Sequence, residues 1–326
     1  MSQRSKLRCS VTDSAIESAE GAITFARLEE LRVSPVRGNF DAAHLKEVHR
    51  RIFQDFPHHG PGEFRPETAG YVKARRLEAT GERHHVHYAP RQWIDGRLDA
   101  TLADVQGGKA LRGLDPDAFA RRMAKLYGDL DFLHPFREGN SRTLRAFTSQ
   151  LTKEAGYTLD WTWSGADAQS RDRLYKARDK EVTRRAFPGL DQARAGSTEN
   201  RAEYEAYVFV LARYRDSPEL KTLVRDATYR EQDLRAASTF RALADAEGFA
   251  APSNVPRLQA AVAEHSGLAA AFAVMRQAEL FAREKFADGS QREAFFVGVR
   301  ERIAKDISRG KEIVEPVRDV DKQRER

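Results

Sequence analysis

The sequence predicts a mostly α-helical protein with one small β-hairpin and a second helical domain toward its C-terminal end. Apolar residues recur at intervals of three and four along most of the 326-residue chain, which is the periodicity of amphipathic helices. Only residues 57–90 break this pattern, with a Pro/Gly-rich cluster followed by two short strand-like segments. A polar segment after Phe187-Pro188-Gly189 separates two helical regions, and a chain of this length has room for two domains.

The expected elements follow from the same periodicity, taken in chain order. Apolar spacing predicts helices over 14–31, 41–53, 93–105, 115–133, 140–154, 166–185, 201–215, 218–247, 255–265, 268–287 and 291–307. The run 268–275 is apolar nearly all round, so it is expected to be a buried helix. The chain is therefore divided into a flexible N-terminus (1–12), a first domain (13–190), a linker (191–200), a helical C-terminal domain of unknown role (201–309) and a charged tail (310–326).

A β-hairpin is predicted from two short segments, 70–74 and 83–88, that flank Ala79-Thr80-Gly81. The second segment contains three histidines, of which His85 and His87 would share one face of a strand. A metal site is one interpretation of these histidines, but no cysteine and no clear third carboxylate accompanies them. An exposed hairpin is the favoured interpretation.

Composition favours a protein of a reducing cytoplasm. Cys9 is the single cysteine, so no internal disulfide can form. No apolar run approaches the roughly 20 residues of a membrane span, and the basic start of the chain lacks the apolar core of a signal peptide. The net charge of +6 indicates a solvated surface rather than a nucleic-acid partner.

The stretch 134–145 concentrates groups suited to phosphate chemistry. The preceding segment is helical and ends at Pro135, and Asn140 is expected to cap the next helix, so the stretch is predicted to be helix, tight loop, helix. A helix N-terminus presents free N–H groups to an anion, and Arg142 and Arg145 would share one face of that helix. Glu138 beside phosphate requires a cation such as Mg²⁺, and His134 would be a general base.

The same stretch resembles the signature of the Fic (filamentation induced by cAMP) family, His-x-Phe-x-[Asp/Glu]-Gly-Asn-[Gly/Lys]-Arg-x-x-Arg. Ser141 departs from it, because Gly or Lys is usual at that position. The signature matches at His134, Phe136, Glu138, Gly139, Asn140, Arg142 and Arg145. The resemblance implies that 13–190 forms a Fic-fold helical core with a hairpin flap, followed by a bundle-like helical domain.

The resemblance also implies an activity, the transfer of AMP from ATP to a Ser, Thr or Tyr hydroxyl of a target protein. His134 would take the hydroxyl proton, Glu138 would hold Mg²⁺, and Phe136 would anchor the loop. The nucleotide phosphates would lie on Gly139, Asn140, Ser141, Arg142 and Arg145. The target would add as a strand beside the flap, where the candidate contacts are Tyr71, Val72, Lys73, His85 and His87.

Fic proteins are commonly silenced by a helix of pattern [Ser/Thr]-x-x-x-Glu-[Gly/Asn]. Four glutamates here precede Gly or Asn, but none has Ser or Thr four residues earlier; they are Glu20, Glu138, Glu199 and Glu247. The chain therefore resembles the bacterial toxins whose inhibitor is a separate antitoxin, unless Glu17 pairs with Arg145 in the folded chain. Export as an effector is a second location that the resemblance allows.

Two alternative functions remain open at this point. A Fic-fold protein could transfer a phosphate or another nucleoside monophosphate, and Ser141 at the Gly/Lys position leaves that choice open. An inactive Fic core could instead serve for binding, with the basic C-terminal helices contacting nucleic acid or a secretion apparatus. Intact His134 and Glu138 favour an enzyme.

Overall fold

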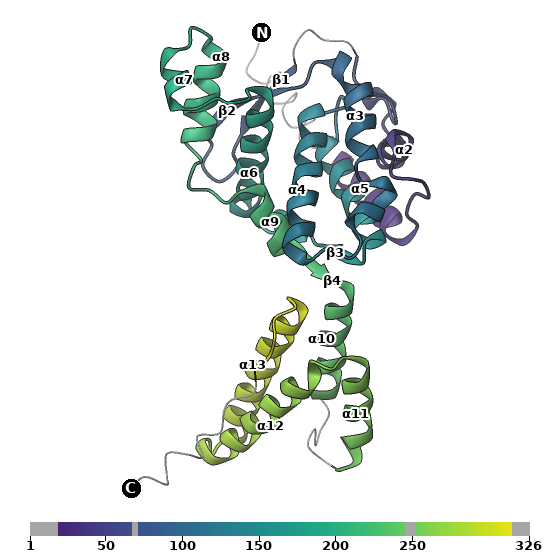
Figure 1. Ribbon diagram of the computed structural model, residues 1–326, viewed down its shortest axis with the longest axis vertical. Coiled ribbons are helices and arrows are strands. Elements are labelled where there is room, and N and C mark those ends of the chain that lie inside the picture. The colour runs from purple at the N-terminus through teal and green to yellow at the C-terminus, as the bar shows by residue number, and fades with distance from the viewer. Residues whose placement is uncertain (1–18, 67–70, 245–251, 315–326) are drawn as a thin grey trace, which may run out of the picture. The chain divides into compact units, whose positions relative to one another are not determined.

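The computed structural model describes residues 19–66, 71–244 and 252–314, and it is mostly α-helical, as predicted (Figure 1). The chain divides into two compact units, Met1–Thr228 and Tyr229–Arg326. Among the residues described, no helix has both the length and the apolar character that crossing a membrane requires. The predicted flexible N-terminus (1–12) and most of the predicted charged tail (310–326) lie outside the described residues.

The first unit combines helices with a β-hairpin (Figure 1). Within the described residues it begins with a helix over 19–33. The elements that follow are α2 (Ala42–Phe53), β1 (Tyr71–Arg76), β2 (Arg83–Tyr88), α3 (Ile94–Ala103), α4 (Pro116–Leu133), α5 (Asn140–Glu154), β3 (Tyr157–Leu159), α6 (Ala168–Ala186), α7 (Gln192–Ser197), α8 (Arg201–Ala206) and α9 (Leu220–Ala227). The short strand β4 (Thr228–Arg230) lies at the boundary between the units.

Aspartate side chains begin several of these helices. The Asp41 carboxylate accepts from the His44 N–H at the start of α2, and Asp167 accepts from Ser170 at the start of α6. At α4, Asp115 accepts from two backbone N–H groups and Pro116 occupies the first helical position. These caps satisfy donors that have no partner within the helix, so each of these helix starts is encoded locally.

The central helix of the first unit is α4, which packs against α3, α5, α6 and α9 (Figure 1). Its buried face includes Phe119, Met123, Tyr127 and Leu130, spaced by three and four residues. Burial of each such side chain contributes about 1.5–3 kcal/mol before the entropy cost of ordering. Since α4 ends at Leu133, this packing fixes the position of His134 within the unit.

The predicted hairpin is confirmed, with β1 and β2 antiparallel and Tyr71 opposite Tyr88. Side chains alternate between two faces of the hairpin. Tyr88, Val86 and His84 of β2 are buried, whereas His85 on the other face is exposed. Among the strands described, β1 pairs with β2 alone, so one edge of β1 carries no strand partner.

The second unit is a small helical bundle. It consists of α10 (Glu231–Ala244), α11 (Val255–Glu264), α12 (Leu268–Lys285) and α13 (Gly289–Ser308). Phe240, Phe272, Met275 and Ile303 belong to its core. The predicted all-round burial of the 268–275 run is wrong, because Ala269 is exposed while Leu268, Ala271, Phe272 and Met275 are buried along one face.

Two features differ from the sequence prediction. The predicted linker 191–200 contains α7, capped by Asp191, and the boundary between units lies later, after Thr228. The predicted helix 218–247 is divided into α9, β4 and α10. The reason is packing: Leu220, Leu223 and Val224 of α9 are buried in the core that contains α4, so α9 belongs to the first unit.

Candidate functional site

His134 lies at the C-terminal end of α4 in the left-handed conformation, with φ 45° and ψ 58°. Such a backbone is unusual for a residue with a side chain, and here it turns the chain from the helix into the following loop. The ring is buried and packs against Tyr88, with centroids 3.9 Å apart. Neither ring nitrogen has a hydrogen-bond partner within the described residues. A buried imidazole without partners is suited to receive a proton from a bound substrate.

The surroundings of His134 favour its neutral form. Burial lowers the pKa of His134 well below 6.5, and the positive charges of Lys73 and Arg178 lower it further. The Asp131 carboxylate lies 4.0 Å from Nδ1, too far for a hydrogen bond. A neutral imidazole at pH 7 is the form in which histidine acts as a base.

Asn140 closes the loop by hydrogen bonds to the backbone of Phe136. The Phe136 N–H donates to Asn140 Oδ1 (2.9 Å), and Asn140 Nδ2 donates to the Phe136 carbonyl (2.7 Å). The expectation that Asn140 is the N-cap is wrong: Gly139 has that position and Asn140 is the first helical residue. The reason is that the Asn140 amide bonds backward across the loop instead of to the N–H groups of α5.

Phe136 and Gly139 hold the loop against the core. The Phe136 ring is fully buried and stacks on His49, with centroids 3.9 Å apart. Gly139 has φ 75°, and a Cβ at this position would lie 2.0 Å from ring atoms of Phe53. Glycine is therefore required here both by the backbone angle and by the closeness of Phe53.

The N-terminus of α5 is surrounded by guanidinium groups. Arg142 donates to Thr24 Oγ1 (2.8 Å) and forms an ion pair with Glu20 (3.5 Å). Arg145 donates to Ser164 Oγ and to the Ser141 carbonyl, each at 3.3 Å. These cations and the free N–H groups of the first helical turn form a cradle for an anion, which hereafter means the N-terminus of α5 with Ser141, Arg142 and Arg145.

Glu138 belongs to the loop, beside the cradle, and faces Lys73 of the hairpin. Its Oε1 accepts from the Gly139 N–H (2.9 Å), and its Oε2 lies 3.6 Å from Lys73 Nζ. Burial raises the pKa of Glu138, but the Gly139 N–H and the charges of Lys73 and Arg142 outweigh burial, so the net shift is downward. An ionised, half-exposed carboxylate next to a candidate phosphate site matches the way Mg²⁺ is held, by one or two carboxylates together with phosphate oxygens.

The candidate flap residues divide between the two faces of the hairpin. Tyr71 and Lys73 reach toward the loop, and each donates to the Arg137 carbonyl at 3.4 Å. Val72 is on the opposite face and exposed. His85 and His87 share that face, as predicted, with His85 3.9 Å from Glu205 and His87 against Phe187. Only Tyr71 and Lys73 of the five contact the loop that contains Glu138.

The three hairpin histidines do not converge. The buried His84 donates from Nε2 to the Asp179 carboxylate (2.8 Å), on the face away from His85 and His87. No metal-ligand cluster includes any of these three among the described residues. His85 is exposed, which agrees with the exposed-hairpin interpretation.

Two sets of residues at the site were not singled out from the sequence. Glu20 and Thr24 reach Arg142 from the helix over 19–33, across more than a hundred residues of chain. The buried Asp131 and Arg178 form a two-point ion pair, and Arg178 also donates to Ser141 Oγ (3.0 Å). Asp131 could have been predicted to lie near His134, because it precedes that residue by three positions on the same helix. The sequence contains no comparable signal that Arg178 lies near the loop. Glu17 lies outside the described residues.

Together the fold and the site define a helical domain in which a buried imidazole and an acidic side chain adjoin a group of cations at a helix N-terminus. The model of the Fic/DOC family matches residues 39–152, which include the whole loop. The chain is 31% identical over 152 residues to the "Probable protein adenylyltransferase Fic" of Salmonella typhimurium, covering 44% of this chain and 68% of that protein. This chain belongs to the Fic/DOC family.

Two further similarities extend this comparison. The chain is 37% identical over 147 residues to the "Protein adenylyltransferase VbhT" of Bartonella schoenbuchensis, covering 45% of this chain but only 28% of that protein. A crystal structure of the BepC protein of Bartonella tribocorum with bound AMPPNP aligns at 21% identity and a TM-score of 0.46, covering 67% of this chain and 88% of that one.

Proposed function

We propose that this protein is a protein adenylyltransferase that transfers AMP from ATP to a Ser, Thr or Tyr hydroxyl of a target protein. The observation that carries the proposal is the state of His134. Its imidazole is buried and neutral, has no hydrogen-bond partner among the described residues, and precedes a cradle of cations at a helix N-terminus. The matched relatives carry the name of this activity, which supports the same assignment here.

Each site residue has a role in that reaction that follows from its position. His134 accepts the proton of the target hydroxyl, whose oxygen then bonds to the α-phosphorus of ATP while the bond to pyrophosphate breaks. The cradle binds the phosphates and stabilises the charge that develops on them. Mg²⁺ held at Glu138 would neutralise phosphate charge. Phe136 and Asn140 keep the loop rigid, so the base and the cradle hold their spacing.

We also propose where the target lies and how the protein is controlled. One edge of β1 has no partner among the strands that the structure describes, and this edge suits the addition of an extended target segment, with Tyr71 and Lys73 next to the loop. A toxin or exported effector that is restrained by a separate antitoxin is the biological setting we infer. The Glu20–Arg142 ion pair is a contact inside the chain that ATP phosphates would have to compete with.

The proposal is tested with two forms of labelled ATP and a bacterial lysate. Label at the α-phosphate is expected on a protein band, and label at the γ-phosphate is not. Label transferred only from the γ position would identify a phosphotransferase instead. The absence of transfer from either form, under conditions in which the protein binds ATP, would favour a binding protein with an inactive Fic core.

Replacement of Glu20 by glutamine is expected to tighten ATP binding. The Glu20 carboxylate neutralises part of the Arg142 charge, so its removal leaves more positive charge for phosphate. A partly exposed ion pair of this kind is worth up to about 1 kcal/mol, which corresponds to roughly threefold to fivefold in Kd. Titration with a fluorescent ATP analogue measures it.

The matched control is Glu29→Gln, on the same helix but paired with Arg32. This variant is expected to bind ATP as the natural chain does. Equal affinity of the Glu20→Gln variant and the natural chain would show that the ion pair does not compete with phosphate.

The pH dependence of transfer is expected to reflect the lowered pKa of His134. Burial and neighbouring cations hold that pKa well below 6.5, so the imidazole remains neutral as pH falls through 6.5. The acid limb of kcat/KM, at saturating Mg²⁺–ATP, is therefore expected to lie below pH 6.5. A midpoint at or above 6.5 would mean that the base is an unperturbed histidine or another group.

A further inference from the structure

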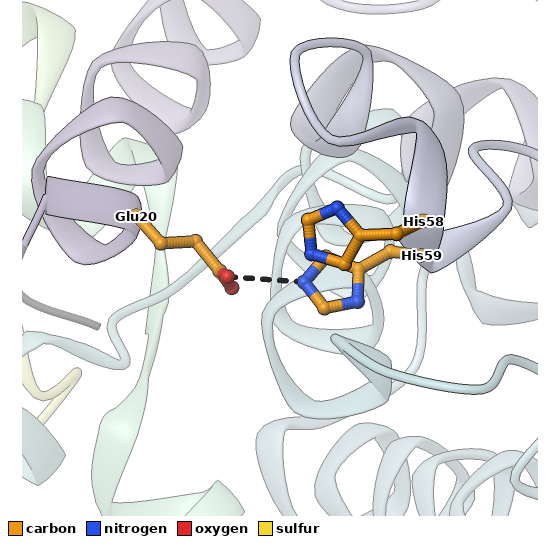
Figure 2. Close-up of side chains that lie close together, drawn as sticks. All are labelled: Glu20, His58 and His59. Atoms are coloured by element: carbon orange, nitrogen blue, oxygen red, sulfur yellow. Dashed lines mark hydrogen bonds and ion pairs between the residues drawn. The ribbon is translucent and has the colours of Figure 1, made fainter. Parts of the chain in front are cut away.

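Three potential metal ligands meet where the helix over 19–33 faces the turn Pro57–His59. Figure 2 shows the Glu20 carboxylate directed at the two imidazole rings of His58 and His59. Glu20 Oε2 lies 3.0 Å from His59 Nε2, and the ring centroids of His58 and His59 are 4.1 Å apart. One ligand atom from each residue lies within 4.8 Å of the other two.

The spacing of two of these atoms, Glu20 Oε2 and His59 Nε2, is close to what a tetrahedral ion requires. Two ligand atoms bound at 2.0–2.1 Å to one tetrahedral ion are about 3.3 Å apart. The Glu20 and His59 atoms are therefore already near that separation, and the exposed His58 has room to rotate into place. Two imidazoles and one carboxylate, with an open fourth position, form a ligand set that zinc uses in proteins.

The surroundings orient two of the three ligands. Arg142 holds the other oxygen of Glu20 at 3.5 Å, and the His59 ring packs edge-on against Phe53, with centroids 5.5 Å apart. Gly60 ends the turn at φ 62° and its N–H donates to the Pro57 carbonyl, which fixes the backbone that carries both histidines. Contacts that orient the ligands in this way are typical of metal sites rather than of freely moving surface histidines.

We propose that Glu20, His58 and His59 form a binding site for a divalent transition-metal ion, with Zn²⁺ as the best fit. The site is separate from the magnesium position proposed at Glu138, because imidazole nitrogens suit zinc whereas Mg²⁺ prefers oxygen ligands. A bound ion would join the helix over 19–33 to the Pro57–His59 turn, next to Arg142 of the cradle. This proposal does not depend on the adenylyltransferase activity.

The test is a zinc titration of the full-length protein after treatment with a chelator, in competition with a fluorescent zinc indicator. We expect His58→Ala, His59→Ala and Glu20→Gln each to weaken zinc binding at least tenfold. The matched control His85→Ala removes an exposed imidazole of the hairpin and is expected to leave the zinc affinity unchanged. Cobalt(II) provides a second readout, since a four-coordinate site gives a strong visible absorption band that the three variants should lose.

Circular dichroism establishes that each variant is folded. His58 is exposed, so its replacement leaves the core intact. The zinc affinity of the His58→Ala variant therefore tests the proposal even if the His59→Ala variant unfolds. Equal zinc affinity of the natural chain and the His58→Ala variant would overturn the proposal. Loss of binding in His85→Ala, with no loss in His58→Ala, would also overturn it and would place the metal on the hairpin.

Discussion

Replacement of His134 by alanine is expected to lower kcat for AMP transfer by about 10²–10⁴-fold, which is the usual contribution of a positioned general base. The target hydroxyl would lose its proton acceptor while the cradle would still bind the nucleotide phosphates. The measurement is single-turnover transfer of α-phosphate label at saturating ATP, so that binding and chemistry are separated.

Binding of ATP to the His134→Ala variant provides the control. Neither ring nitrogen of His134 forms a hydrogen bond in the described structure, so removal of the ring breaks no hydrogen bond. The Kd for ATP is therefore expected to stay within about twofold of the natural value, given how little a lost non-bonded contact changes binding. Transfer at an undiminished rate would show that another group is the base.

Replacement of Arg178 by alanine is expected to destabilise the first unit by about 3–5 kcal/mol, because it leaves the Asp131 carboxylate buried without its partner. Both side chains are almost fully buried, and two hydrogen bonds of 2.7 and 2.9 Å join them. The three tryptophans of the chain, Trp93, Trp161 and Trp163, all belong to the first unit. Urea unfolding followed by tryptophan fluorescence therefore measures this unit.

Two variants make that result specific to the buried pair. Arg184→Ala, on the same helix, removes two ion pairs of an exposed arginine, with Glu181 and Glu219, and is expected to cost about 1 kcal/mol or less. The double variant Asp131→Leu/Arg178→Met replaces both charges by apolar side chains and is expected to recover at least half of the lost stability. If Arg178→Ala costs no more than Arg184→Ala, the buried pair is not a main determinant of stability.

Much of the fold could be predicted because its signals are local. The bounds of α4 and α5 agree with the apolar spacing to within a residue, and the strand 83–88 agrees fully. The division of 218–247 could not be predicted in this way, because Leu220 and Val224 fit a long helix as well as a short one. Packing of α9 in the core of the first unit ends that helix before Thr228, and no property of the segment alone required it.

The site residues also divide into those that local sequence predicts and those that it does not. The sequence predicted the loop between α4 and α5 and the residues on it, because they lie within twelve consecutive positions. It predicted the wrong role for Asn140, since a capping side chain and a side chain that bonds backward to Phe136 have the same local pattern. Of the hairpin candidates, alternation correctly placed His85 and His87 together, but not the contact of Tyr71 and Lys73 with the loop.

The sequence by itself determined most of the helices of the first unit, the hairpin and the order of chemical groups along the loop, because each depends on neighbours only a few residues away. Tertiary structure alone decided which distant groups meet that loop. Arg178 reaches Ser141 from α6, Glu20 reaches Arg142 and His59 from the helix over 19–33, and Lys73 reaches Glu138 from β1. These contacts depend on how whole elements pack, and packing is set by the complete core.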